Sequence, residues 1–96
     1  MNMNELTSEQ RKAILHLAEK YGASNVRIVG SVARGEATPT SDVDILVTFP
    51  VNKSVFNLVG LWLDLTELLE HEVSLLTDDS VEGEFKATLE RDAVPL

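Results

Sequence analysis

Residues 26–48 of this chain read VRIVGSVARGEATPTSDVDILVT, two apolar runs separated by a glycine-containing turn and a polar loop. The first run, residues 26–29, predicts a short strand that ends at Gly30, and a short helix is expected to start at Ser31. The second run, residues 43–48, predicts another buried strand. A strand, a short helix and a second strand in close succession are typical of an α/β fold.

Two kinds of chemical group meet in this stretch. Gly30 has no Cβ, so backbone N–H groups of the turn at Gly30 and Ser31 can approach a phosphate closely, helped by the positive end of the following helix. Asp42 and Asp44 start the second run, and the two-residue period of a strand places both carboxylates on one face. Two hard oxygen ligands facing a phosphate-binding turn suit Mg²⁺. Either half alone is also an ordinary turn or strand end, so the combination carries the prediction of a site for a metal-bound nucleoside triphosphate.

The same residues resemble the signature of the minimal nucleotidyltransferases, which belong to the DNA polymerase β-like superfamily. That signature is Gly-Ser, ten residues, and then Asp-x-Asp. Here Gly30 and Ser31 are followed by residues 32–41, which are ten residues, and then by Asp42 and Asp44 around a single valine. The resemblance covers most of the chain and implies a nucleotidyltransferase fold, with ATP as substrate and Mg²⁺ as cofactor.

Arg34 and Ser41 also fit the family pattern, which has Ala-Arg-Gly after the turn and a serine before the first aspartate. Two roles for Arg34 stay open, because a guanidinium suits either bidentate partner: it contacts phosphate, or it pairs with Glu36 and braces the turn. The resemblance assigns metal binding and catalysis to the two aspartates and phosphate binding to Gly30, Ser31, Arg34 and Ser41.

A third carboxylate is missing where the resemblance leads one to expect it. Two-metal nucleotidyl transfer typically uses a third acidic residue to prepare the nucleophile. In the family it lies in the third strand, and the corresponding residues 68–77 read LLEHEVSLLT, with Ser74 at that position. Glu72 lies two residues earlier on the same face of the expected strand, and it either extends toward the site or is solvated at the turn. A weak catalyst, an inactive binding protein and a chain altered by substitution all remain open.

The rest of the chain supplies the scaffold. We expect the fold class to be α/β (α+β), a small mixed sheet of three or more strands packed by helices in the order α-β-α-β-α-β-α. The chain, residues 1–96, is expected to be a single minimal nucleotidyltransferase domain. The remaining predicted elements are a helix over residues 7–21 that starts in a capping box, a loop over 36–41 containing Pro39, a helix over 55–70, a strand over 72–76, and a last helix capped by Asp79 or Ser80 that runs through Arg91.

Composition limits the possible partners. The 96 residues leave no room for a second, substrate-binding domain, so the acceptor is expected to come from a partner. The net charge of −8 makes bare nucleic acid a poor partner and favours a basic protein. Cysteine is absent, and no apolar stretch or leader pattern indicates a membrane span or a signal peptide, so we expect a cytoplasmic protein.

The resemblance also implies a partner. Small proteins of this family commonly accompany a HEPN-domain ribonuclease toxin and neutralise it by adding AMP to a toxin tyrosine, which implies a hetero-oligomer. Because of Ser74, neutralisation by binding alone is the alternative, and a transferase acting on a free small molecule fits a chain this short least well. Trp62 and Phe56, in the helix over 55–70, are expected in the core or against a partner rather than stacked on a base. His16 and His71 are expected at the surface.

Overall fold

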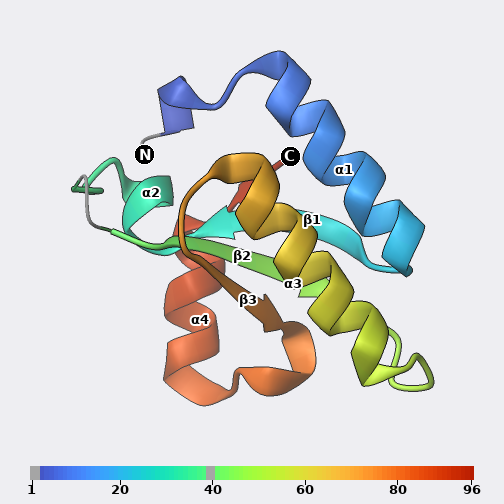
Figure 1. Cartoon of the computed structure of the whole chain (residues 1–96). Coiled ribbons are helices and arrows are strands. Elements are labelled where there is room, and N and C mark those ends of the chain that lie inside the picture. The colour runs from blue at the N-terminus through green and yellow to red at the C-terminus, as the bar shows by residue number, and fades with distance from the viewer. Residues whose placement is uncertain (1–2, 39–40) are drawn as a thin grey trace.

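The computed structural model describes residues 3–38 and 41–96, without the side chain of Asn4. A sheet lies at the centre, with helices on both sides (Figure 1). Pro39 and Thr40, in the predicted loop, lie outside the described residues. The elements, in chain order, are the 3₁₀ turn η1 (Met3–Glu5), α1 (Ser8–Tyr21), β1 (Ser24–Val29), α2 (Gly30–Arg34), β2 (Val43–Thr48), α3 (Val55–Leu69), β3 (Val73–Thr77), the 3₁₀ turn η2 (Asp78–Ser80), α4 (Gly83–Asp92) and β4 (Val94–Pro95).

The sheet is mixed and has the strand order β3-β2-β1-β4. β1 pairs antiparallel with β2 and with β4, whereas β2 and β3 run parallel and are joined through α3. In this register Asp44 lies opposite Val29 on one side and Ser74 on the other. The α/β class, the mixed sheet and the alternating order are therefore confirmed. The two-residue strand β4 is an addition that the sequence pattern did not predict.

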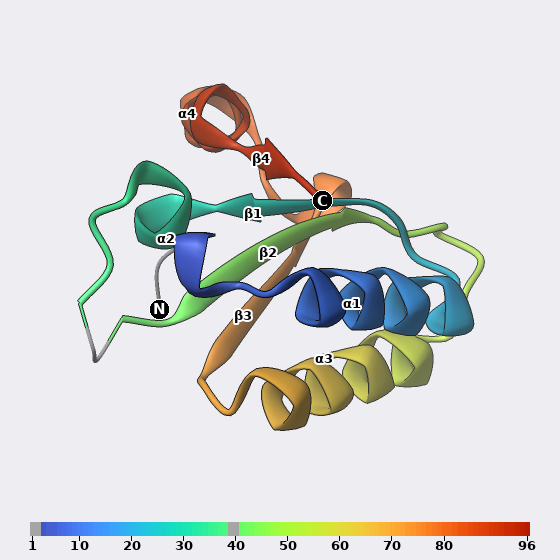
Figure 2. The same cartoon turned by 90° about the horizontal axis from the view of Figure 1, so that it is seen from above.

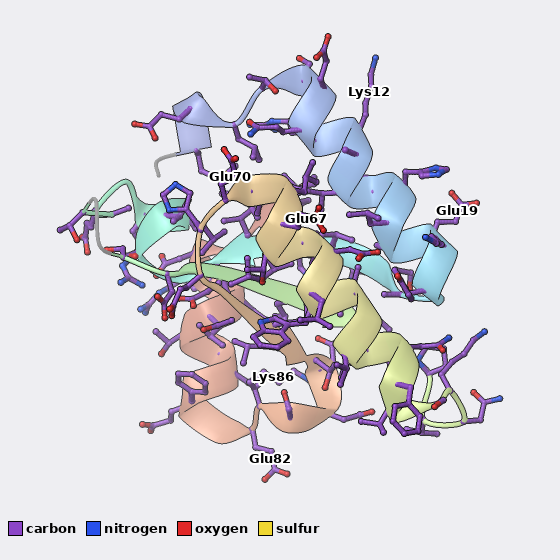
Figure 3. All side chains as sticks on the ribbon, in the orientation of Figure 1. Lys12, Glu19, Glu67, Glu70, Glu82 and Lys86 are labelled. Atoms are coloured by element: carbon purple, nitrogen blue, oxygen red, sulfur yellow. The ribbon has the colours of Figure 1, made fainter. Side chains whose placement is uncertain are left out.

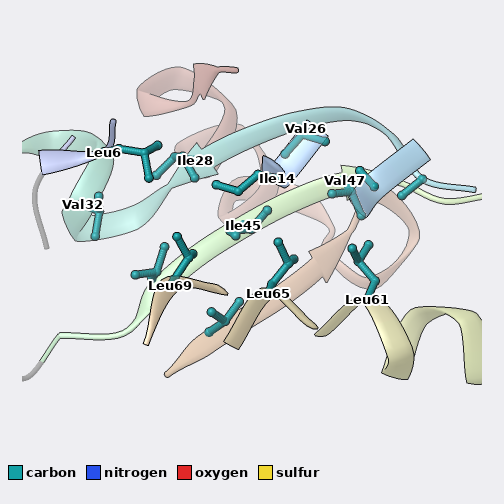
Figure 4. Close-up of a cluster of buried hydrophobic side chains, with 14 residues drawn as sticks. Leu6, Ile14, Val26, Ile28, Val32, Ile45, Val47, Leu61, Leu65 and Leu69 are labelled. Atoms are coloured by element: carbon teal, nitrogen blue, oxygen red, sulfur yellow. The ribbon is translucent and has the colours of Figure 1, made fainter. Parts of the chain in front are cut away.

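The larger core fills the face of the sheet covered by α1 and α3 (Figure 2). Alternation along β2 sends Val43, Ile45 and Val47 to this face, where all three side chains are buried. Helical spacing gives α3 a matching stripe, seen edge-on against the strands in Figure 4. The stripe consists of Leu61, Leu65 and Leu69.

The opposite face carries a smaller core under α4. Val29 of β1 and Leu46 of β2 pack there with Leu89 of α4 and with Val81. Because Asp44 is two residues from Leu46, it lies on this same α4 side of the sheet. The face with the thinner cover is therefore the face that carries the predicted site.

Two helix starts show where local prediction holds and where it fails. The capping box before α1 is confirmed: Thr7 Oγ1 accepts from Gln10 N at 3.0 Å, and Gln10 Oε1 accepts from Thr7 N at 2.9 Å. The predicted cap of the last helix is wrong, because residues 78–80 form a 3₁₀ turn and α4 begins only at Gly83. Ser80 is engaged in closing that turn, with its Oγ accepting from Thr77 N at 3.0 Å.

The outer side of α3 is apolar as well as its inner side. Trp62 lies over the edge strand β3, and its indole Nε1 donates to the carbonyl of Val73 at 2.6 Å. The exposed large apolar side chains of α3 are Val55, Phe56, Val59, Trp62 and Leu63.

No helix within residues 3–38 and 41–96 is long and apolar enough to cross a membrane.

Candidate active site

The glycine turn and the second aspartate are in direct contact. Gly30 has φ of +72°, a left-handed conformation that favours glycine, and a Cβ added there would collide with Oδ2 of Asp44. Strand pairing explains the contact, because Val29 of β1 is the register partner of Asp44 in β2. The antiparallel pairing of β1 with β2 thus brings Gly30 and Asp44 together although they are 14 residues apart in the chain. The Asp44 carboxylate lies against the backbone of the turn.

Ser74 lies on the other side of Asp44 from the glycine turn. It is the register partner of Asp44 in the parallel β2–β3 pair, and its hydroxyl donates a hydrogen bond to the Asp44 carboxylate. Burial raises the pKa of Asp44, and the neighbouring charge of Asp42 raises it further, against the opposing effects of the Ser74 hydrogen bond and the Arg34 charge. The net result is a raised pKa, because no cation compensates fully for the partly buried charge.

A pocket of about 440 Å³ opens beside Gly30, Asp44 and Ser74. Its size is in the range of pockets that hold small ligands. One wall is polar, with the turn, the aspartate and the serine, and the other is apolar and comes from β3 and α4. The lining residues are Gly30, Ser31, Arg34, Asp44, Ser74, Leu76, Phe85 and Leu89.

Three of the residues singled out from the sequence are not among the described lining residues of the pocket. Asp42 is exposed immediately before β2, close enough for its charge to act on Asp44. Ser41 braces the loop, since its Oγ accepts from Thr38 N at 2.9 Å. Glu72 has an exposed side chain at the turn entering β3, where its carbonyl accepts from Val43 N at 2.9 Å.

Arg34 makes the ion pair with Glu36, one of the two arrangements considered for it, and its contact with phosphate stays a prediction. Its Nε lies 3.2 Å from Oε2 of Glu36, and its side chain also lines the pocket. Because an exposed ion pair of this kind stabilises a protein by less than about 1 kcal/mol, Arg34 is able to exchange Glu36 for an anionic ligand at little cost. Other charged side chains, such as Lys12 and Glu19 of α1 and Glu82 before α4, project away from the molecule (Figure 3).

The donor set fits Mg²⁺ rather than a nitrogen- or sulfur-preferring metal. Asp42 and Asp44 supply carboxylate oxygens, and Ser74 supplies a neutral hydroxyl beside them. Over residues 3–38 and 41–96, no group of three or more His, Cys, Asp or Glu side chains could hold a metal ion. Mg²⁺ commonly binds through one or two protein carboxylates and completes its octahedron with water and phosphate oxygens. The residues present therefore fit this ion when it arrives with a phosphate ligand.

The apolar wall is the part of the pocket that sequence reasoning missed. Leu76, Phe85 and Leu89 fall in the predicted third strand and last helix, and the sequence pattern assigns them no functional role. The four-residue spacing of Phe85 and Leu89, which places both on one helix face, is a signal that was available. What the sequence did not show is that this face lies against the glycine turn.

A glycine turn abutting a strand aspartate at the edge of a pocket, on a mixed α/β sheet, defines the nucleotidyltransferase class. The model of the nucleotidyltransferase domain family matches residues 10–95, and the chain belongs to this family. Within it the chain is a minimal nucleotidyltransferase domain protein, which confirms the resemblance found in the sequence.

Named relatives agree in length as well as in sequence. The chain is 39% identical to the "putative protein adenylyltransferase MJ0435" of Methanocaldococcus jannaschii, over 98% of this chain and 97% of that protein. It is 35% identical to the protein adenylyltransferase MntA of Thermococcus cleftensis, over 96% of this chain and 98% of the relative.

Solved structures share the fold. A structure described as a "putative minimal nucleotidyltransferase" superposes with a TM-score of 0.87 at 35% identity, covering 100% of this chain and 97% of the other. A crystal structure of a toxin–antitoxin with AMP-PNP superposes with a TM-score of 0.73 at 19% identity, covering 88% of this chain and 69% of that one. At that identity the second likeness concerns the fold alone.

Proposed function

We propose that this chain is a protein adenylyltransferase that uses Mg²⁺ to transfer AMP from ATP to a tyrosine of a HEPN-type ribonuclease toxin, and so acts as an antitoxin in the cytoplasm. The observation that carries the proposal is the contact between Gly30 and Asp44 at the mouth of a pocket. The full-length likeness to proteins named as adenylyltransferases supports the choice of reaction. The whole chain, residues 1–96, acts as one domain in this proposal.

The proposed chemistry assigns separate tasks to the glycine turn, to Arg34 and to the two aspartates. Backbone N–H groups at Gly30 and Ser31 bind the triphosphate, and Arg34 leaves Glu36 to contact a phosphate oxygen. Asp42 and Asp44 would hold Mg²⁺, and the bound ion would neutralise charge on the phosphates. The tyrosine hydroxyl gives up its proton to water as its oxygen attacks the α-phosphorus in line. The bond between the α-phosphorus and the oxygen that bridges it to the β-phosphorus breaks, and pyrophosphate leaves. Positioning and charge neutralisation provide most of the acceleration.

The partner is proposed from charge and from the exposed face of α3. The net charge of −8 favours a basic protein surface. The exposed apolar side chains of α3, including Trp62 at 42% exposure, provide area that a protein partner would bury. A fold relative is a toxin–antitoxin, and its bound AMP-PNP is an analogue of the proposed substrate. We therefore expect a hetero-oligomer of this chain with the toxin.

Neutralisation by binding alone is the second candidate, and Ser74 favours it. The structure aligns Ser74 with Asp44 across the β2–β3 ladder, where a third carboxylate would complete a two-metal site. Serine supplies no charge and is a poor base. In this candidate the pocket retains nucleotide and the exposed α3 face blocks the toxin by contact.

Intact-mass measurement separates the two candidates. The chain and its toxin are incubated with Mg-ATP, and the toxin is expected to gain the mass of one AMP on a tyrosine and to lose ribonuclease activity. In the matched control, Asp42→Asn/Asp44→Asn, we expect neither change. An unmodified toxin that is still inhibited without ATP, and equally by the double variant, contradicts adenylylation and supports binding.

A further inference from the structure

We propose that Phe85, with Leu76 and Leu89, forms the platform on which the base of the bound nucleoside triphosphate stacks. This inference rests on the proposed function, because it assigns the second half of the same pocket. It adds a residue of α4 to a site that the sequence motif places entirely between β1 and β2.

The pocket, like the proposed ligand, has a polar part and an apolar part. Its polar part contains Gly30, Asp44 and Ser74, whereas the side chains of Leu76, Phe85 and Leu89, which also line the pocket, carry no hydrogen-bonding group. A nucleoside triphosphate is likewise charged at one end and flat and largely apolar on its base faces at the other. If the triphosphate binds at the glycine turn, the apolar wall is the surface left for the base.

Strand geometry brings the two walls close together. Leu76 is two residues after Ser74 in β3, so both side chains lie on the α4 side of the sheet. Two residues of strand span only about 7 Å. The apolar wall thus begins within a short distance of the Asp44–Ser74 pair, which is where the reacting phosphates are proposed to lie.

Helix geometry explains why Phe85 is available. Phe85 and Leu89 are four residues apart and lie on one face of α4. Leu89 is buried against the sheet with Val29 and Leu46, whereas Phe85, one turn earlier, is 59% exposed. The helix therefore extends its core-facing stripe past the core and over the open pocket. An exposed aromatic ring that lines the pocket offers a surface on which a base can stack.

Calorimetry on the isolated chain tests the platform with two ligands, each with Mg²⁺: AMP-PNP, which has a base, and inorganic tripolyphosphate, which has none. Phe85→Ala is expected to weaken AMP-PNP binding about tenfold, the size of a lost base–aromatic stack, and to leave tripolyphosphate binding unchanged. Phe85→Trp keeps a ring and is expected to bind AMP-PNP as tightly as the wild type. Phe56→Ala is the matched control, because Phe56 is 80% exposed on α3 and outside the pocket.

The outcomes separate this inference from the proposed function. AMP-PNP binding that is unchanged by Phe85→Ala overturns the platform and leaves the proposed function standing. Equal weakening of both ligands also overturns it, because the substitution would then act on the phosphate end. A wild-type chain that binds neither ligand contradicts the proposed function itself.

Discussion

Two aspartates on the α4 side of the sheet have opposite surroundings. Asp44, near the start of β2, has a pKa raised by burial and by Asp42. Asp78, which follows β3, accepts from Thr48 Oγ1 at 2.5 Å and from Arg27 Nη2 at 2.9 Å. Burial alone would raise the pKa of Asp78, but these two hydrogen bonds and the Arg27 charge outweigh it and hold the pKa below its usual value.

The difference separates a carboxylate that stabilises the fold from one that is available to a ligand. Among the described residues, Arg27 is the charged residue that is buried, with 10% of its side chain exposed. Asp78 is its close ion-pair partner. Asp44 instead has a serine and a glycine turn as neighbours. A charge that remains poorly compensated within the fold is characteristic of a functional site.

The largest expected effect comes from Asp44→Asn. Loss of a metal-binding carboxylate should reduce adenylyl transfer on the order of 10³-fold. Because the charged form of Asp44 is disfavoured in the fold, the free energy of unfolding should stay the same or rise by less than about 1 kcal/mol. Transfer is measured with radiolabelled ATP and stability by urea denaturation. If the variant lost both activity and a clear part of its stability, Asp44 would be a residue that stabilises the fold, as Asp78 does.

Gly30→Ala tests the contact between the turn and this carboxylate. The added Cβ collides with Asp44 Oδ2 at a φ of +72°, so we expect a loss of transfer on the order of 10²-fold from misplacement of the carboxylate. Gly35→Ala is a matched control, because Gly35 has the same φ and nothing within 4 Å of an added Cβ. Both variants carry the same backbone strain, about 1–2 kcal/mol, and only Gly30→Ala should lose activity. Equal activity in the two variants would contradict the importance of the contact.

This contrast also shows how far the sequence was informative. The motif predicted the strand before Gly30 and the strand after Asp42 because apolar runs and a turn glycine are local signals. The ion pair of Arg27 with Asp78 was not predicted, because its members are 51 residues apart and neither has a distinctive neighbourhood in the chain. The late start of α4 was missed for a different, local reason, since Ser80, one of the two residues expected to cap it, accepts from Thr77 N and closes a 3₁₀ turn instead.

The candidate site divides in a similar way. Gly30, Ser31, Arg34, Asp44 and Ser74 were all named from the sequence and all line the pocket, although their roles remain predictions. The parallel register sets Ser74 beside Asp44, whereas its occupation of the position of a third carboxylate stays a prediction. The apolar wall depends on how α4 crosses the sheet, which is a matter of tertiary packing that one sequence does not reveal.

Asp78→Asn is expected to have a moderate effect on stability and none on the chemistry. It leaves the buried Arg27 guanidinium with a neutral partner and with Glu90 at 4.0 Å, so the free energy of unfolding should fall by about 1–2 kcal/mol. Transfer per folded molecule should be unchanged. Asp79→Asn, at an exposed neighbouring position, is the control and should alter neither quantity. A loss of adenylyl transfer by folded Asp78→Asn would show that the contact of Asp78 with Thr48, at the end of β2, affects Asp44 near the start of the same strand.

The smallest expected effect is the dependence of stability on acid. The pKa of Asp78 is lower in the folded chain than its ordinary value of about 3.9, so its ionised form stabilises the fold fully above that value. This stability is lost as the pH falls from about 4 through the lower, folded pKa. The raised pKa of Asp44 acts in the opposite direction, because protonating it below its folded pKa removes a disfavoured charge. Urea denaturation between pH 2 and pH 7 should therefore show a steeper acid loss in Asp44→Asn than in the wild type, and a shallower one in Asp78→Asn. Identical slopes in all three proteins would mean that the two carboxylates have the same environment in solution.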